Sequence, residues 1–419
     1  MKILWITNTC LPFVAKQLGL KLSVFEGWNI YSSELLANVD EVTFAVASPV
    51  NIKADGVIKV VENKMIGYCF SASVINDKVS MEHIWNEIYR DFQPDIVHIQ
   101  GTEMPHGFSY LKTCGNRNVV ASIQGMTSVY ERYFYAGVDF LDMVKHYSIY
   151  DCISSNSIFA GRKRCQKSGR NEVLMISSLD NIIGRTTWDK SHAWSINKDI
   201  KYFKCNEILR KGFYSSRRWN YDDCEKRTIF LSQCKYPIKA LHMVLKAMPL
   251  VLREFPDARI RIGSCLRIIP HSLIEKMAPT NYGGYLYDMI KTLKLENHID
   301  FLGNLTEEQM ITEYLKANVF ISPSSIENSP NSLGEAQILG TPSISSNVGG
   351  VEDMSRNGET TICYRFEEYE MLAYYICEIF HNRVDYHRFE VARQDALKRH
   401  NPDSVIQNLI NIYSKILER

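Results

Sequence analysis

Several signatures are missing from this sequence of 419 residues, and each absence excludes a class of protein. No apolar run reaches the roughly 18–20 residues that a membrane-spanning helix needs. None of the 11 cysteines stands in a C-x-x-C pair, which excludes a zinc ribbon or a paired redox centre. Lys and Arg number 48 against 47 Asp and Glu, and this balance argues against a dedicated nucleic-acid binder. The scattered cysteines indicate free thiols in a reducing compartment, so we expect a cytoplasmic protein.

The common nucleotide- and metal-binding signatures are missing as well. No G-x-G-x-x-G follows a predicted strand, which excludes a single-domain dehydrogenase, and no Walker A pattern is present. The sequence also lacks a D-x-D pair of carboxylates, the group that holds a divalent metal on the nucleotide in many metal-dependent sugar transferases. We therefore expect neither a metal nor a cofactor.

What the sequence does contain is an alternation of short apolar runs with segments of helical period, which predicts an α/β protein with helix-covered parallel sheets. The length and the repeated pattern indicate two domains, residues 1–210 and 211–394, with the charged stretch Arg210–Lys226 as their connection. The first apolar run stops at Thr7-Asn8-Thr9, which indicates a strand rather than a signal peptide. The predicted strands are Ile3–Asn8, Val42–Ala47, Ile96–Gln100, Val119–Ile123, Val173–Ile176, Thr228–Ser232, Arg259–Gly263, Ile299–Leu302, Val319–Ser322, Ser343–Ser346 and Thr361–Tyr364. The predicted first-half helices are Ser23–Ala37, Met81–Phe92 and Phe159–Lys167.

Two second-half helices are predicted most clearly. Ala240–Phe255 places its large apolar residues on one face at spacings of three and four, and it ends before Pro256. Glu307–Ala317 begins with Thr306 and Gln309 at the spacing of a capping box.

The stretch 319–342 is the most informative part of the sequence. A buried strand ends near Ser322, and a polar loop carrying Glu327 leads to a new helix that Gly340 ends. We expect Ser329 as the N-cap and Pro330 in the first helical position. The amides of the first turn, Asn331, Ser332 and Leu333, would then form an anion site suited to a phosphate.

Glu335 lies inside this helix and Glu327 in the loop ahead of it. Carboxylates beside a phosphate site are suited to accepting hydrogen bonds from hydroxyls, such as those of a ribose and a sugar. The alternative is a solvated loop residue and a first-turn glutamate that the helix dipole favours.

The pair and its context resemble the E-x7-E signature of retaining glycosyltransferases of the GT-B fold, specifically glycosyltransferase family 4, the glycosyl transferases group 1. The context is a strand ending Ile-Ser-Pro-Ser, a helix with Glu-Ala and Gly-Thr-Pro, and then Ser345–Asp353. The resemblance implies two Rossmann-like doubly wound domains facing across a cleft. It also implies that the C-terminal segment Val391–Leu417 returns to the first domain, which residues 395–419 would complete.

The resemblance also implies roles for single residues. Glu335 would hold the donor ribose, Glu327 would lie near the transferred sugar, and the amides of Asn331 to Leu333 would bind the diphosphate. The family's G-R-x-x-x-x-K-G loop keeps its lysine here as Lys239, a catalytic candidate that can neutralise a leaving diphosphate without metal. Its arginine is absent: Gln233 stands near its place, and Lys235 is the nearest substitute. Two glycines on the donor side complete the set, Gly303 at a strand end and Gly27 in a loop before a first-domain helix.

In the first domain, many relatives place a histidine where this sequence has Gln124, which can hydrogen-bond a sugar but cannot carry a proton. His98, Glu103 and His106 lie at the end of an earlier strand. We expect His98, Glu103 and Gln124 on the acceptor side and His106 as a catalytic candidate, with a core histidine as the alternative for His98.

The resemblance implies a retaining, metal-independent hexosyltransferase that moves a sugar from a nucleoside diphosphate sugar to a hydroxyl of a glycan or lipid-linked glycan, in surface polysaccharide biosynthesis. The basic run Arg162–Arg170 is either a solvated helix face or a contact with anionic lipid headgroups on the cytoplasmic face of a membrane. Two other functions fit the same scaffold: a nucleotide-sugar epimerase, which needs an acid and a base but no acceptor, and a non-catalytic nucleotide-sugar-binding protein.

Overall fold

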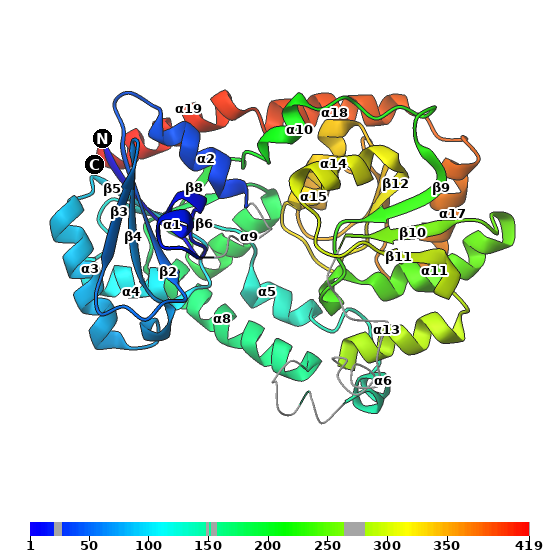
Figure 1. Ribbon diagram of the computed structural model, residues 1–419, viewed down its shortest axis with the longest axis horizontal. Coiled ribbons are helices and arrows are strands. Elements are labelled where there is room, and N and C mark those ends of the chain that lie inside the picture. Colours follow the sequence, from blue (N-terminus) through cyan, green and yellow to red (C-terminus); the bar gives the residue numbers. More distant parts are fainter. Residues whose placement is uncertain (21–26, 148–150, 152–156, 264–280, 419) are drawn as a thin grey trace. The chain divides into compact units, whose positions relative to one another are not determined.

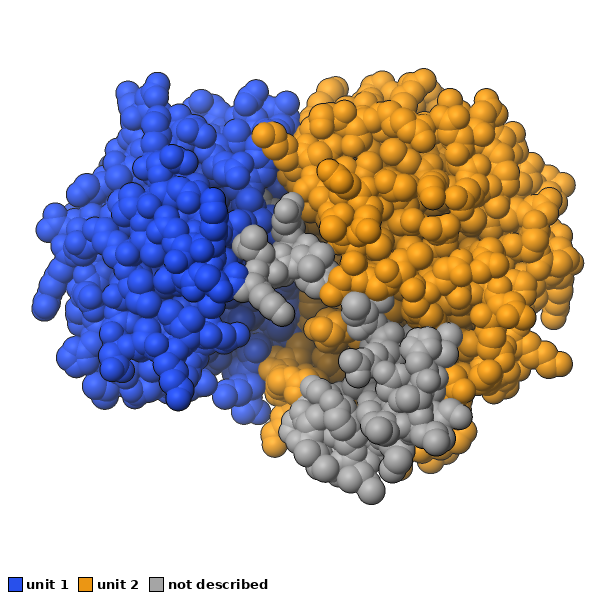
Figure 2. All heavy atoms as spheres, in the orientation of Figure 1, with its two compact units in different colours: residues 1–129, 166–208, 400–419 blue, residues 130–165, 209–399 orange. Residues whose placement is uncertain are grey.

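A computed structural model describes residues 1–20, 27–147, 151, 157–263 and 281–418 (Figure 1). The chain divides into two compact units (Figure 2). The first unit comprises residues 1–129, 166–208 and 400–419, and the second unit comprises residues 130–165 and 209–399. Helices α5 (Thr127–Tyr130) and α8 (Ile158–Ser178) contain residues assigned to each unit.

The first unit is built on an eight-stranded sheet of order β3-β4-β2-β1-β5-β6-β7-β8. All described pairs are parallel except β3 with β4, which are antiparallel. The strands are β1 (Lys2–Ile6), β2 (Thr43–Val50), β3 (Ile58–Glu62), β4 (Met65–Ser71), β5 (Ile96–Gln100), β6 (Val119–Ser122), β7 (Asn181–Gly184) and β8 (Lys201–Lys204). The helices wholly within this unit are α1 (Pro12–Gln17), α2 (Trp28–Ala37), α3 (Lys78–Phe92), α4 (Pro105–Cys114), α9 (Thr187–Ile196) and α19 (Pro402–Leu417).

The second unit is built on an all-parallel six-stranded sheet of order β11-β10-β9-β12-β13-β14. Its strands are β9 (Glu225–Leu231), β10 (Arg259–Ile262), β11 (Ile299–Phe301), β12 (Ala317–Ser322), β13 (Ser343–Ser346) and β14 (Ile362–Tyr364). Its described helices are α6 (Phe140–Lys145), α10 (Lys211–Ser215), α11 (Leu241–Glu254), α13 (Asn281–Thr292), α14 (Glu307–Lys316), α15 (Asn331–Leu339), α16 (Val351–Ser355), α17 (Tyr369–Phe380) and α18 (His387–Arg399), with a 3-10 turn η3 at Pro237–Lys239.

Helices cover both faces of the second sheet (Figure 1). Because successive side chains of a strand point to opposite faces, Ile229 and Leu231 of β9 enter one apolar cluster and Phe230 the other. Helices α11 and α17 pack on the first face, and α14 and α15 lie on the second. The predicted fold class, α/β with two doubly wound sheets, is confirmed.

Most predicted strands form within a few residues of their predicted ends, and one is wrong. Val173–Ile176 lies inside helix α8, where Val173 and Leu174 are exposed while Met175 and Ile176 are buried. That burial pattern fits a helix packed along one side. The capping box of Thr306 and Gln309 is confirmed. The predicted start of a helix at Ser23 lies outside the described residues, and α2 begins at Trp28.

The stretch Arg210–Lys226, predicted as the connection between the two domains, lies within the second unit. From Leu209 onward the chain packs into the second unit, where Trp219 donates its ring N–H to the Ala317 carbonyl and stacks on Tyr386. Residues 130–165 also group with this unit, because Val138, Met143 and Ile158 join its core. In the first unit, Tyr413 of α19 accepts a 3.0 Å hydrogen bond from Trp5 of β1.

Candidate functional site

The site predicted from the sequence forms where the strand order of the second sheet reverses. Strands β10 and β11 lie on one side of β9, while β12 to β14 lie on the other. The connections that leave β9 and β12 therefore run to opposite faces of the sheet, and a crevice opens between them at the carboxyl ends of these strands. Open α/β sheets bind their ligands in such a crevice. Lys239 follows β9, and Glu327 follows β12.

Lys239 and Glu327 form an ion pair at this point. Glu327 also accepts a 2.7 Å hydrogen bond from the Ser324 hydroxyl. The Lys239 side chain is 20% exposed and that of Glu327 is 10% exposed, so the pair is largely withdrawn from water. Lys239 ends the turn η3, and Ala240 then takes a left-handed φ of 49° as the chain enters α11.

The turn at Gly349 and Gly350 packs against the backbone of the loop that carries Glu327. Gly350 donates its amide to the Glu327 carbonyl at 3.0 Å. Gly349 has a φ of 55°, and a Cβ added there would lie 1.9 Å from that carbonyl oxygen. On the other side, Ser325 donates its amide to the Ile238 carbonyl at 2.8 Å. The loop is therefore fixed between the β9 connection and a turn that requires glycine.

Helix α15 begins one residue later than predicted. Its N-cap is Pro330, so the predicted N-cap Ser329 is wrong: the Ser329 hydroxyl contacts the Met354 sulfur at 3.5 Å. Leu333 donates its amide to the Pro330 carbonyl at 3.0 Å, so this amide is engaged within the first turn of α15, and the phosphate-binding role of Asn331 to Leu333 stays a prediction. Gly340 ends the helix at a φ of 77°, as predicted.

Glu335 is buried on the first turns of α15, and an arginine that sequence analysis missed holds its carboxylate. Arg210 donates to both carboxylate oxygens, each at 2.8 Å, and the Tyr314 hydroxyl lies 3.4 Å from Glu335 Oε2. Burial works against charge on Arg210, but Glu335 and its neighbours still hold the pKa of Arg210 above its ordinary value. A carboxylate that accepts from a planar guanidinium is fixed in both position and direction.

The other donor-side candidates occupy separate places. Gly303 follows β11 with a φ of 76°. Lys235 and Gln233 are exposed residues of the β9 connection, and the Lys235 ammonium lies 5.7 Å from the centre of the Tyr236 ring. The predicted donor glycine Gly27 belongs to the first unit, where it is the N-cap of α2.

The first sheet also reverses its order, between β1 and β5, and two predicted residues lie there. Glu103 accepts a 3.1 Å hydrogen bond from Asn8, and burial raises the pKa of Glu103 to about 7. His106 is buried, its Nε2–H donates to the Thr7 carbonyl at 3.2 Å, and burial lowers its pKa to about 4. His106 is therefore a neutral imidazole at pH 7, and its catalytic role stays a prediction.

His98 and Gln124 occupy different settings in the first unit. His98 is fully buried, with Nδ1 2.6 Å from the Tyr413 hydroxyl and Nε2 2.6 Å from the Ser122 hydroxyl. Gln124 uses its backbone carbonyl to accept from the Arg185 guanidinium at 2.6 Å. The contacts of His98 are those of the core histidine that was the alternative for this residue.

The described residues offer neither a metal site nor a membrane-spanning helix. They contain no cluster of three or more His, Cys, Asp or Glu side chains placed to hold a metal ion. No described helix is both long enough and apolar enough to cross a bilayer.

Comparison with known sequences finds glycosyltransferases among the proteins similar to this chain. Residues 216–395, within the second unit, match the family described as "Glycosyl transferases group 1". The phosphatidyl-myo-inositol mannosyltransferase of Mycobacterium leprae is 23% identical over 197 residues, which are 47% of this chain and 48% of that protein. The 2-deoxystreptamine N-acetyl-D-glucosaminyltransferase of Niallia circulans is 29% identical over 128 residues, 30% of this chain and 33% of that protein. The chain thus spans half or less of the length of these curated relatives.

Solved structures match over the whole chain. Sucrose-phosphate synthase from Thermosynechococcus elongatus has a TM-score of 0.71 at 13% identity and covers 100% of this chain and 99% of its own. HepE from Anabaena in complex with UDP-glucose has a TM-score of 0.66 at 13% identity and covers 99% and 100%. These proteins are GT-B glycosyltransferases, and the chain shares their fold.

Proposed function

We propose that this protein is a retaining, metal-independent glycosyltransferase that moves a sugar from a nucleoside diphosphate sugar to a hydroxyl group. The second unit would bind the nucleotide sugar and the first unit the acceptor. The observation that carries the proposal is the buried Lys239–Glu327 pair at the switch point of the second sheet, inside the segment that matches the group 1 family. Relatives that bind UDP or UDP-glucose support the choice of donor class.

The geometry around α15 supports separate roles for the residues that would bind the diphosphate and those that would bind the ribose. The diphosphate would lie at the helix N-terminus, where the amides of Asn331 and Ser332 and the helix dipole favour an anion. Lys239 would neutralise the charge that develops on the leaving diphosphate, which is the role a metal plays in other transferases. Glu335, fixed by Arg210, would accept hydrogen bonds from the ribose hydroxyls.

Glu327 would lie beside the transferred sugar. Its charge is balanced by Lys239 in the structure, and a donor diphosphate that attracts the lysine would leave the carboxylate available for sugar hydroxyls or for developing positive charge on the ring. In front-face attack, the leaving phosphate takes the acceptor's proton as its bond to the anomeric carbon breaks and the acceptor oxygen bonds to that carbon. This step requires no histidine at the position of Gln124.

The acceptor would be a glycan or a lipid-linked glycan, in surface polysaccharide biosynthesis. The name of the mannosyltransferase relative contains a lipid acceptor, which is consistent with this class. Exposed basic residues of α8, namely Lys163, Arg164, Lys167 and Arg170, would contact anionic headgroups at the cytoplasmic face of a membrane. Arg162 is excluded from this set because it pairs with Glu131 at 2.6 Å and lies over the Tyr135 ring.

The proposal is tested by incubating the full chain with UDP- and GDP-sugars, with and without glycan acceptors, and following both nucleotide and sugar by chromatography and NMR. A transferase releases the free nucleotide and forms a glycoside with the anomeric configuration of the donor. A new nucleotide sugar formed without acceptor would identify an epimerase instead. Tight UDP or GDP binding with no turnover of any donor would identify a binding protein.

A further inference from the structure

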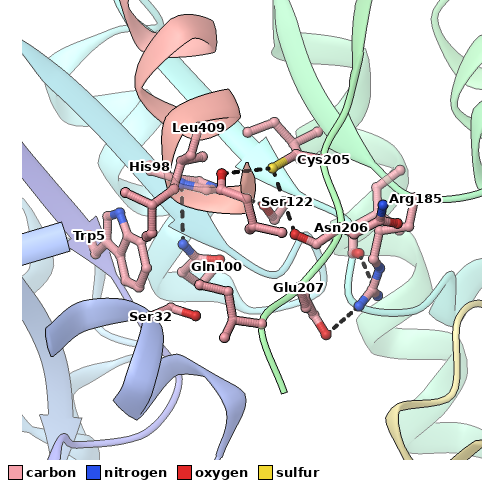
Figure 3. A pocket seen from close by; sticks show the side chains of 15 residues that line it. Trp5, Ser32, His98, Gln100, Ser122, Arg185, Cys205, Asn206, Glu207 and Leu409 are labelled. Atoms are coloured by element: carbon pink, nitrogen blue, oxygen red, sulfur yellow. Dashed lines mark hydrogen bonds and ion pairs between the residues drawn. The ribbon is translucent and has the colours of Figure 1, made fainter. Parts of the chain in front are cut away.

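Pockets in the two units differ in the size of ligand that they can hold. The pocket of the first unit between β1, β5 and α19 has a volume of about 40 Å³, which is room for a few ordered waters (Figure 3). A pocket of the second unit has a volume of about 350 Å³, within the range of small-ligand sites. It lies at β14, the outermost strand of the second sheet, and none of the residues proposed to bind the donor lines it.

The polar side chains of this β14 pocket come from separate segments of the second unit. Asn347 lies in the connection after β13, and Asn357 lies in the turn before β14. Arg365 directly follows β14, while Tyr375 belongs to α17 and Arg388 to α18. The fold therefore gathers two guanidinium groups, two side-chain amides and a phenol around one cavity.

The β14 pocket has a positive charge that its own walls do not balance. The described residues that line it include Arg365 and Arg388 but no aspartate or glutamate. Arg388 donates to the carbonyls of Gly358 at 2.7 Å and Glu359 at 3.1 and 3.2 Å, which fixes its guanidinium without neutralising it. Arg365 is exposed, and neither arginine forms an ion pair with a described residue. A half-buried cation without a carboxylate partner is stabilised by a bound anion.

The arginines of another pocket in the second unit, of about 380 Å³, already have a carboxylate partner. Arg218 and Arg393 lie 3.6 and 3.9 Å from the carboxylate of Glu390, which lines the same pocket. The unbalanced charge at β14 therefore distinguishes the two pockets.

The amides beside the arginines are suited to hydroxyl groups. Asn347 and Asn357 are exposed, and their side chains form no hydrogen bond with the described residues. Their backbones are fixed: the Asn347 amide donates to the Tyr364 carbonyl at 2.7 Å, and the Asn357 amide donates to the Glu352 carbonyl at 3.1 Å. A side-chain amide offers both a donor and an acceptor, which is what a sugar hydroxyl needs.

We propose that the β14 pocket binds an anionic monosaccharide unit, a sugar that carries a phosphate or a carboxylate. The anionic group would pair with Arg365 and Arg388, because a guanidinium matches the geometry of both groups. The hydroxyls would bond to Asn347 and Asn357, and the ring would lie against Tyr375. The sugar is either a free sugar phosphate or a uronic acid residue of a glycan.

The test is titration calorimetry of the full chain with glucose 6-phosphate, glucuronate, glucose and inorganic phosphate, each in the presence of saturating UDP. UDP occupies the proposed donor site, so the titration reports binding elsewhere. We expect at least one anionic sugar to bind about tenfold more tightly than glucose and inorganic phosphate do. Absence of binding by both anionic sugars overturns this inference. Absence of UDP binding would instead contradict the proposed function.

Variants locate the binding. Arg365→Gln removes an exposed charge from the pocket, so the fold should stay intact. Arg253→Gln is the matched control, because Arg253 is an exposed arginine of α11 in the same unit that does not line the pocket. We expect Arg365→Gln to weaken binding of the anionic sugar about tenfold, with UDP binding and the Arg253→Gln variant unchanged. Equal affinity in Arg365→Gln and wild type overturns the inference.

Further measurements assign the source of the sugar. Asn347 precedes Gly349 by two residues, and Gly349 packs against the Glu327 carbonyl. A free sugar phosphate would therefore change the kcat of transfer, a consequence that rests on the proposed function. A change in kcat with glucose 6-phosphate that is lost in Arg365→Gln identifies this source. Tighter binding of a uronic acid oligosaccharide than of glucuronate, again lost in Arg365→Gln, identifies a glycan. Each result supports the pocket and assigns its ligand.

Discussion

Arg210 holds Glu335 through two hydrogen bonds of 2.8 Å, although 125 residues of chain separate them. Arg210 lies two residues after Ile208, where the chain passes from the first unit to the second, and Glu335 lies in the segment that matches the family. A carboxylate offers about four lone-pair sites, so Glu335 can keep Arg210 and still accept from a ribose. The contact therefore fixes Glu335, the carboxylate proposed to bind the ribose, against the residues where the chain enters the second unit.

Replacing Arg210 tests whether it positions Glu335. Arg210→Lys keeps the charge but loses the two-pronged contact, so we expect the KM for the donor to rise about tenfold with little change in kcat. Arg217→Lys is the matched control, because Arg217 pairs with Asp223 on the surface, where such pairs contribute little. Equal donor KM values in wild type and Arg210→Lys would remove Arg210 from the donor site.

Gly349→Ala tests the support of the Glu327 loop. The added Cβ would meet the Glu327 carbonyl oxygen at 1.9 Å, and the φ of 55° is unfavourable for alanine. We expect a loss of roughly 2 kcal/mol or more in unfolding free energy and a fall in kcat, measured by denaturant unfolding and steady-state kinetics. Gly358→Ala is the control: its φ is 88°, but the nearest atom to the new Cβ is 3.7 Å away. Both variants place alanine at a positive φ, so a larger loss of unfolding free energy in Gly349→Ala measures the steric clash with the Glu327 carbonyl.

Glu103→Gln tests the raised pKa in the first unit. Burial raises the folded pKa of Glu103 to about 7 from an ordinary value of 4.5, so the folded state holds its proton more tightly than the unfolded state. Its contribution to stability is complete below pH 4.5 and is lost as the pH rises through about 7. We expect wild type to lose on the order of 1–3 kcal/mol against Glu103→Gln between about pH 4 and pH 8, measured by urea unfolding. A difference that does not change with pH would contradict the shift.

Charge removal on α8 tests membrane contact. The double variant of Lys163→Gln and Lys167→Gln removes two exposed charges, each worth about 1 kcal/mol near an anionic surface, so vesicle binding should weaken roughly 10- to 30-fold. The double variant of Lys53→Gln and Lys64→Gln removes two exposed charges of the first unit that lie outside α8, and it should bind like wild type. Co-sedimentation with vesicles of anionic or neutral lipid measures both. Equal binding of all three proteins to anionic vesicles would assign the α8 charges to a solvated face.

The sequence predicted correctly those structural features that depend on residues close together in the chain. The capping box of Thr306 and Gln309, the end of α15 at Gly340 and the apolar face of α11 all depend on residues close in the chain. The resemblance added Lys239 and gave roles to Glu327 and Glu335, and the structure places these three residues in two largely buried ion pairs.

The features that the sequence did not predict depend on contacts between residues far apart in the chain. No local pattern marks Arg210 as the partner of Glu335. Strand β8 is short and only half-buried, so it carries little apolar pattern, and Val173–Ile176 has strand-like composition but continues a long helix. The antiparallel pair β3 and β4 did leave a signal, since Asn63 and Lys64 form a turn between them.

The most direct test of the central claim is the steady-state kinetics of donor turnover by Glu327→Ala and Glu335→Ala. Loss of Glu327 should lower kcat by about 10²-fold or more with a small change in donor KM. Loss of Glu335 should mainly raise the donor KM, because its proposed contact with the ribose is equally strong in the ground state and in the transition state. Nucleotide release at wild-type kcat and KM in both variants would contradict the account of this site.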